Sequence, residues 1–131
     1  MPLPYGDKTV KEELTKRPAL DIDADLLAFL HTRINSFVKW DVIQFFHRNP
    51  NTIDTADNIA RYIGRTGKTV REEMAELSNS GILEEDGLGD VIIYSLSRDP
   101  EVRDQLHQFA QRCDDQQFEL KAVYYVLRSM R

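Results

Sequence analysis

The 131-residue sequence predicts a mainly α-helical domain that carries one small β-hairpin and has helical extensions at its N- and C-terminal ends. Three observations predict this fold class. Two short amphipathic segments near the middle of the chain are separated by only three residues, 64–66, which indicates two helices joined by a tight turn. After Gly81 the apolar pattern changes from a helical period to that of extended strands. A long C-terminal segment then places apolar residues three or four positions apart, as an amphipathic helix does.

Composition indicates an ordinary globular protein. Hydrophobic residues make up 41% of the chain, and no apolar run approaches the ~20 residues of a membrane span. The first residues lack the apolar segment of a secretory signal peptide. Cys113 is the one cysteine, so an internal disulfide is excluded. We therefore expect a cytoplasmic protein that does not associate with membranes.

Three regions are expected along the chain. Residues 1–20 are charged and interrupted by prolines, and we predict a flexible N-terminal arm whose four Lys and Arg exceed its three Asp and Glu by one. Residues 21–98 are expected to form the central domain, with the hairpin over about residues 82–96. Residues 99–131 are expected to form a C-terminal helix that serves as a dimerisation element.

The central domain is predicted to begin with two helices, over residues 21–32 and 36–48, because their apolar side chains repeat at helical spacing. Pro50 favours an end to the second helix just before it. This second helix is very apolar and contains the single tryptophan, Trp40. We therefore expect it either at the centre of the core or buried against a partner.

The next two helices flank the tight turn, and the hairpin follows them. Thr55 is a good N-cap for the first of these helices, and Gly64 suits the left-handed conformation at its C-terminal end. Thr66 is expected to cap the second helix, which residues 79–81 end. A strand is expected to begin at residues 82–83, followed by a turn over residues 85–90 with two glycines and a returning β-branched strand over residues 91–96.

The C-terminal segment opens with Asp99 as a helix cap and Pro100 at the first helical position. Its apolar residues follow the alternating three- and four-residue steps of a heptad seam. We predict that this seam forms a homodimer, either as one long helix or as two helices that meet at residues 114–115. The alternative is that the seam folds back on the core of its own chain. The predicted dimerisation residues are Val102, Leu106, Phe109, Cys113, Leu120, Val123 and Leu127.

A family resemblance is carried by the stretch TADNIARYIGRTGKTVREEMAELSNSGILEEDGLGDVIIYSLS. Together with the helix before it, this stretch resembles the winged helix-turn-helix superfamily of bacterial transcription regulators. It looks like the small dimeric repressors of the ArsR and PadR types, in which a Gly-Ile-Leu step leads from the recognition helix into the wing. The resemblance covers about half of the chain. It implies a winged helix-turn-helix with flanking helices and a dimeric, sequence-specific DNA-binding transcriptional regulator.

In such regulators the N-terminal half of the second helix of the motif enters the major groove of double-stranded DNA. Residues 61–71 of this chain contain four basic residues and no acidic one. Arginine pairs with guanine edges, whereas lysine and threonine suit phosphates. The predicted DNA-binding residues are Arg61, Arg65, Thr66, Lys68, Thr69 and Arg71.

An acidic stretch argues against DNA as the partner. Residues 72–90 contain seven acidic residues and no basic one, and the net charge of the chain is −5. Glu72 alone is tolerable because glutamate can read cytosine. An acidic wing, however, would repel phosphates. The alternative interpretation is therefore a winged-helix protein-interaction module that does not bind DNA.

Other chemistry is less well indicated. Residues 64–69 look like a phosphate-binding loop, but Tyr62 occupies the position of the required glycine, and the segment follows a helix. No nucleophile–base pair is visible, so we do not expect an enzyme, and no cofactor or metal is expected. A metal-sensing site built across a dimer from His107, Cys113 and Asp114 is a minor alternative. A small effector could bind among aromatics in a dimer cavity, and the candidates are Phe37, Trp40, Phe45 and Phe109.

Overall fold

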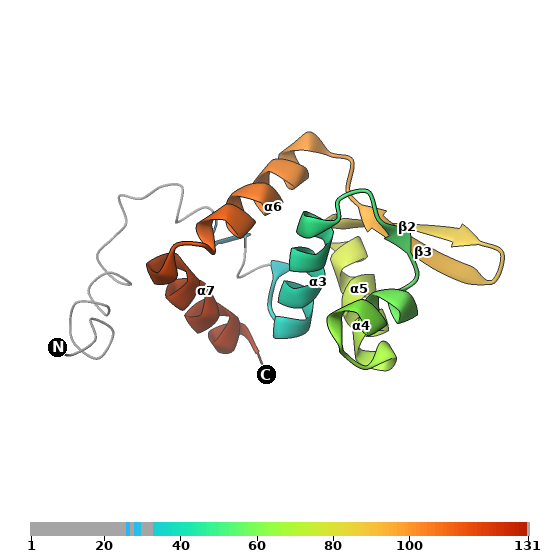
Figure 1. Cartoon of the computed structure of the whole chain (residues 1–131), viewed down its shortest axis with the longest axis horizontal. Coiled ribbons are helices and arrows are strands. Elements are labelled where there is room, and N and C mark those ends of the chain that lie inside the picture. The colour runs from blue at the N-terminus through green and yellow to red at the C-terminus, as the bar shows by residue number, and fades with distance from the viewer. Residues whose placement is uncertain (1–25, 27, 30–32, 131) are drawn as a thin grey trace.

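The structure is a computed structural model that describes residues 26, 28, 29 and 33–130. This part of the chain is mainly helical, with a small antiparallel sheet (Figure 1). In chain order the elements are α3 (Phe37–Arg48), β1 (Ile53–Asp54), α4 (Ala56–Ile63), α5 (Gly67–Asn79), β2 (Leu83–Leu88), β3 (Val91–Leu96), α6 (Pro100–Arg112) and α7 (Gln116–Ser129). Within this described part, no helix combines the length and apolar character needed to cross a membrane.

The predicted N-terminal arm, residues 1–20, lies outside the described residues, as does most of the first predicted helix. Of that helix the structure describes Leu26, Ala28 and Phe29, which are helical. Leu26 and Phe29 are buried and belong to the same core as the rest of the chain. The predicted apolar spacing in this segment therefore does place side chains in the core.

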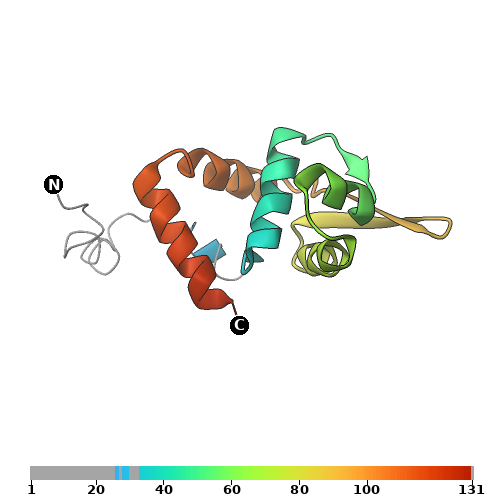
Figure 2. The same cartoon turned by 60° about the horizontal axis from the view of Figure 1, so that its bottom comes forward.

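Helix α3 begins and ends where its sequence predicts. The hydroxyl of Ser36 accepts a hydrogen bond from the Lys39 backbone amide at 3.1 Å, and the helix ends at Arg48, just before the Asn49-Pro50 step. Figure 2 shows α3 standing between α7 on one side and α4 and α5 on the other. This central position explains why the helix is so apolar. Its Phe46 is fully buried, and its Trp40 packs edge-on against Phe109 of α6 with ring centroids 5.2 Å apart.

Helices α4 and α5 are joined by residues 64–66. The Thr55 hydroxyl caps α4 by accepting from the Asn58 amide at 3.2 Å, and Gly64 ends the helix with φ of 72°, a conformation that favours glycine. Thr66 is the N-cap residue of α5 as predicted, but its side chain makes no cap hydrogen bond. Its hydroxyl donates instead to the Thr69 hydroxyl at 3.1 Å. One face of α5 is completely buried through Val70, Met74 and Leu77.

The sheet has the strand order β1-β3-β2. The predicted six-residue turn over residues 85–90 is wrong. Strand β2 pairs with β3 as far as Leu88 opposite Val91, so the turn contains only Gly89 and Asp90, with φ of 64° at the glycine. The hairpin is therefore longer than predicted and projects away from the helices (Figure 1). Strand β1, a two-residue strand whose Ile53 pairs with Ser95, was not predicted from the sequence.

The C-terminal segment forms two helices, α6 and α7, which is the second of the two predicted alternatives. Asp99 caps α6 by accepting from the Glu101 amide at 2.9 Å. After α6, residues 113–115 turn, and Asp115 caps α7 by accepting from the Gln117 amide at 2.9 Å. The predicted seam divides at this turn. Val102, Leu106 and Phe109 pack into the core of their own chain, whereas Leu120 and Leu127 are exposed.

Candidate nucleic-acid interface

The predicted DNA-binding residues lie around one corner of the molecule, where α4 turns into α5. Arg61 is in the last turn of α4, Arg65 and Thr66 are in the linking turn, and the others are in the first half of α5. All six predicted side chains are exposed. The structure therefore brings these six residues together on one exposed surface, and their role in DNA binding stays a prediction.

Two of the arginines in this surface are held by carboxylates of neighbouring helices. Arg65 Nε lies 2.6 Å from Asp41 Oδ2 of α3, and Arg71 Nη1 lies 2.5 Å from Asp57 Oδ1 of α4. Both pairs are exposed; the Arg71 and Asp57 side chains retain 55% and 57% of their accessible surface. Exposed pairs of this kind contribute about 1 kcal/mol or less, because water solvates both partners. Either arginine can therefore exchange its carboxylate for a phosphate at little cost.

The other two basic residues have no carboxylate partner among the described residues. Arg61 Nη1 donates only to Asn58 Oδ1, at 3.3 Å. Lys68 is exposed and makes neither a hydrogen bond nor an ion pair within the described part of the chain. Lys68 also lies one residue inside α5, where the positive end of the helix dipole favours an approaching anion.

Two of the seven acidic residues that follow are turned toward α3. The Ser36 hydroxyl donates a hydrogen bond to Glu73 Oε1. Lys39 Nζ donates to Glu76 Oε1 at 2.5 Å and to Asn35 Oδ1 at 2.6 Å, and only 4% of the lysine is exposed. These contacts fix α5 against α3. They also offset the Glu76 charge with a nearby ammonium.

Two more acidic residues are engaged at the base of the hairpin. Glu84 accepts from the Arg98 backbone amide at 2.7 Å and from Arg98 Nε at 3.0 Å. The amide hydrogen bond lowers the pKa of Glu84, and partial burial opposes this shift. The positive charges of Arg98 and Arg103 and the Arg98 side-chain hydrogen bond lower the pKa further. Glu85 accepts from the Tyr94 hydroxyl, and burial, with this hydrogen bond and the Glu85 charge, raises the pKa of Tyr94 to about 12.

Four of the seven acidic residues in this stretch are therefore bound to partners elsewhere in the chain. Only Glu72, Asp86 and Asp90 have no such contact within the described residues. The repulsion of phosphate that the sequence predicts is correspondingly reduced. The sequence could not indicate this, because the partners of Glu73 and Glu76 lie 37 residues earlier in the chain.

The end of the hairpin is apolar, a feature that the sequence analysis missed. Leu88 is 67% exposed, Val91 44% and Ile92 49%. The acidic Asp86 and Asp90 lie beside them in the sequence. Exposed apolar residues rimmed by charge are typical of protein-docking surfaces and not of phosphate-binding ones. The sequence does contain an indication of this patch. The three β-branched residues 91–93 follow the turn directly, so apolar side chains are expected at the end of the hairpin.

The predicted dimerisation residues fall into two groups. Val102, Leu106 and Phe109 are buried, and Cys113 and Val123 are half-buried. On α7, Leu120 is 39% exposed and Leu127 57% exposed, and they are accompanied by exposed Tyr124 and Met130. Homodimerisation stays a prediction, and the accessible apolar surface for it lies on α7.

The aromatic side chains predicted to line an effector cavity lie in two separate groups. Trp40 contacts Phe37 at a centroid distance of 6.0 Å and Phe109 at 5.2 Å. Phe45 instead stacks on Tyr62 of α4, with centroids 5.6 Å apart and an interplanar angle of 10°. These rings pack against one another within one chain. An effector cavity formed across a dimer stays a prediction.

A metal site built across a dimer from His107, Cys113 and Asp114 stays a minor alternative, because its ligands would come from two chains. Within the part of the chain that is described, no group of three or more His, Cys, Asp or Glu residues is placed to hold a metal ion. Burial, assisted by the negative charges of Glu119 and Asp114, raises the pKa of the Cys113 thiol to about 12. Because the thiolate is the metal ligand, this environment disfavours metal binding by Cys113.

Comparison of the chain with protein-family models, with curated proteins and with solved structures finds no match. The functional assignment therefore rests on the side chains of this surface and on the order of the elements that carry it.

Proposed function

We propose that this chain is a winged helix-turn-helix protein and that it binds double-stranded DNA as a cytoplasmic transcriptional regulator. The element order supports this proposal. Two helices, α4 and α5, are joined by a three-residue turn and are followed directly by the hairpin of β2 and β3, with β1 as a third strand. In winged-helix proteins the helix corresponding to α5 is the recognition helix, and the hairpin is the wing.

The observation that carries the DNA proposal is the charge distribution around the start of α5. Four basic side chains are exposed at this corner, and no acidic residue lies between them in the sequence. Lys68 would contact phosphate, because a flexible ammonium suits a point of negative charge without base specificity. Arg65 and Arg71 would exchange their exposed carboxylate partners for phosphate or guanine.

We further propose that the protein acts as a homodimer through α7. Leu120 and Leu127 lie two helical turns apart on this helix, with exposed Tyr124 between them. Pairing this stripe with its copy buries apolar surface that one chain leaves in water. A two-fold dimer would place two recognition helices on successive half-sites of an operator.

The test is a fluorescence-anisotropy titration of random and genomic duplexes at about 50 mM and about 200 mM salt. The informative variant is Arg61→Ala/Lys68→Ala, because neither side chain has a carboxylate partner in the described structure. The control is Arg48→Ala, an exposed arginine at the end of α3 and outside both the α5 surface and the α7 stripe. We expect wild type and control to bind with equal salt slopes, and the double variant to lose a slope of about one for each phosphate contact removed. Absence of duplex binding at the lower salt would overturn the proposal.

A second candidate function is docking on another protein through the end of the hairpin. The exposed Leu88, Val91 and Ile92, with Asp86 and Asp90 beside them, favour this candidate. Its test uses Leu88→Ser/Ile92→Ser in the same titration. If the hairpin serves DNA, this variant should bind DNA more weakly. If the hairpin docks on a protein, duplex affinity should be unchanged.

A further inference from the structure

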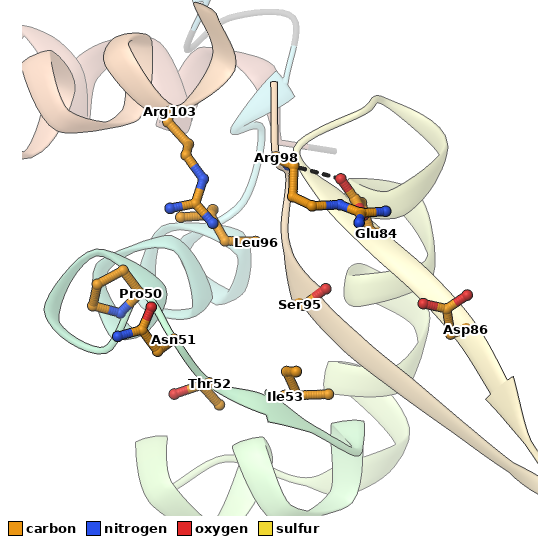
Figure 3. A pocket seen from close by; sticks show the side chains of 10 residues that line it. All are labelled: Pro50, Asn51, Thr52, Ile53, Glu84, Asp86, Ser95, Leu96, Arg98 and Arg103. Atoms are coloured by element: carbon orange, nitrogen blue, oxygen red, sulfur yellow. Dashed lines mark hydrogen bonds and ion pairs between the residues drawn. The ribbon is translucent and has the colours of Figure 1, made fainter. Parts of the chain in front are cut away.

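A groove lies where the end of α3, the base of the hairpin and the start of α6 meet. It consists of two hollows, with volumes of about 300 Å³ and 190 Å³, which share Pro50, Leu96 and Arg103 in their linings. Figure 3 shows the larger hollow, with the loop after α3 on one side and the hairpin strands on the other. The Arg103 side chain reaches down into it from α6.

Arg103 is anchored by one hydrogen bond, and its positive charge also acts on the Glu84 carboxylate. Its Nε donates to the backbone carbonyl of Ser97 at 2.7 Å. The two terminal amino groups of its guanidinium have no hydrogen-bond or ion-pair partner among the described residues. A guanidinium anchored through Nε presents those amino groups in a fixed plane, which is the geometry that grips a carboxylate or a phosphate through two parallel hydrogen bonds.

The smaller hollow has the composition of an anion site. Around Arg103 it is lined by His47 and His107, whose ring centroids are 5.5 Å apart, and it contains no carboxylate. The rest of its wall is apolar, formed by Pro50, Leu96 and Leu106. Imidazoles donate hydrogen bonds to anions in either protonation state, and the apolar wall suits the carbon skeleton of an organic molecule.

The larger hollow contains one carboxylate whose pKa the positive charge of Arg103 helps to lower, that of Glu84. Glu84 is in its lining, but both of its carboxylate oxygens accept hydrogen bonds from Arg98. In Figure 3 the other acidic residue, Asp86, lies further out along the hairpin than Glu84 and away from Arg103. No carboxylate of the groove is therefore paired with Arg103.

We propose that this groove binds a small organic anion. Its carboxylate or phosphate group would lie on the Arg103 guanidinium beside the contacting imidazoles of His47 and His107, and its apolar part against Leu96 and Leu106. This site goes beyond the proposed DNA binding and does not depend on it, because none of its residues belongs to the α5 surface. A ligand there would touch α3, α6 and the strand β3 that leads into α6, and would thereby fix the hairpin relative to the helices.

The test is isothermal titration calorimetry of the full chain with three probes: inorganic phosphate, benzoate and the neutral benzamide. The informative variants are Arg103→Gln and His107→Gln, both at exposed positions on α6. The matched control is Arg128→Gln on α7, which makes the same change of charge away from the groove. A thermal melt of each variant verifies that it is folded.

We expect phosphate or benzoate to bind wild type and Arg128→Gln equally, and the tighter of the two identifies the head group. Arg103→Gln should weaken that binding about tenfold or more, and His107→Gln about threefold, because charge-assisted hydrogen bonds are removed. Benzamide should bind at least about tenfold more weakly than benzoate. The proposal is overturned if neither anion binds saturably to wild type, or if folded Arg103→Gln binds as tightly as wild type.

Discussion

Arg71 of α5 and Asp57 of α4 form an ion pair whose Nη1 and Oδ1 atoms lie 2.5 Å apart, directly over the first residue of α5. That first residue is Gly67, and a Cβ atom added there would lie 2.7 Å from the same Asp57 oxygen. A glycine at this position therefore leaves the space that the pair occupies. The pair joins the two helices that flank the turn and holds one positive charge of the proposed DNA surface beside a negative one.

Removing the partner of Arg71 should strengthen DNA binding. In Asp57→Asn the guanidinium keeps its position near α5 but no longer faces a carboxylate, so we expect duplex affinity to rise about twofold to tenfold at low salt. Stability should change by less than about 1 kcal/mol, because the pair is exposed. Anisotropy titrations and urea unfolding measure the two effects. Asp104→Asn on α6 makes the same change in net charge at a distance; an equal gain in that variant would attribute the effect to overall charge.

The Lys39–Glu76 pair should respond unequally to loss of its two partners. Glu76→Gln leaves a buried ammonium, 4% exposed, with two neutral amide oxygens as acceptors and no carboxylate to offset its charge, and we expect it to destabilise the fold by about 1–3 kcal/mol. Lys39→Met leaves only a carboxylate whose side chain is 58% exposed and hydrated, so the change should be below about 1 kcal/mol. Urea unfolding midpoints compare the two variants. The reverse order would show that Lys39 is not held by Glu76.

Cys113 should be almost unreactive in the folded protein. Burial, with the charges of Glu119 and Asp114, raises its pKa from 9.0 to about 12, so the thiolate fraction at neutral pH falls by about three orders of magnitude. Alkylation by iodoacetamide should therefore be slow in buffer and fast in urea. Because the folded pKa is raised, the associated stability is present below about pH 9 and is lost as the pH rises toward 12. Equal alkylation rates in the two conditions would contradict this.

The two halves of the predicted dimer seam should behave differently on mutation. Leu120→Asp/Leu127→Asp alters exposed positions of α7, so we expect a folded monomer in sedimentation experiments. Leu106→Ala instead removes a buried side chain and should lower the free energy of unfolding by about 2–5 kcal/mol without changing the oligomeric state. A dimer that survives the α7 double variant would place the interface elsewhere.

Helix ends were predictable because caps are local. Thr55, Gly64 and Asp99 act at the ends of α4 and α6 through contacts within a few residues, and such contacts are visible in the sequence. The hairpin turn was mispredicted for the opposite reason. Gly87 and Asp86 are typical turn residues, but their conformation is set by pairing with Ile92 and Ile93 across the sheet. Pairing between the two strands therefore outweighs the local preference of aspartate and glycine for turns.

The candidate site was predicted in position but not in electrostatics. The exposed basic residues are contiguous in the sequence, and their placement follows from the two helices that carry them. The charge balance depends on contacts between distant segments: Arg65 with Asp41, and Glu84 with Arg98. Counts of charged residues along the chain cannot include such contacts. The heptad spacing of apolar residues continues from α6 into α7 across the bend at Asp115. This spacing alone therefore could not show which residues pack on their own chain and which are available for a dimer.

The most direct test of the proposed DNA binding is an NMR titration of the isotope-labelled full chain with duplex DNA. We expect the backbone amide signals of residues 65–71 to shift most, and a higher salt concentration to reverse the shifts. The signals of α7 should not change on addition of DNA. No shift at low salt, or shifts confined to the hairpin residues 88–92, would contradict the assignment of α5 as the DNA-contacting helix.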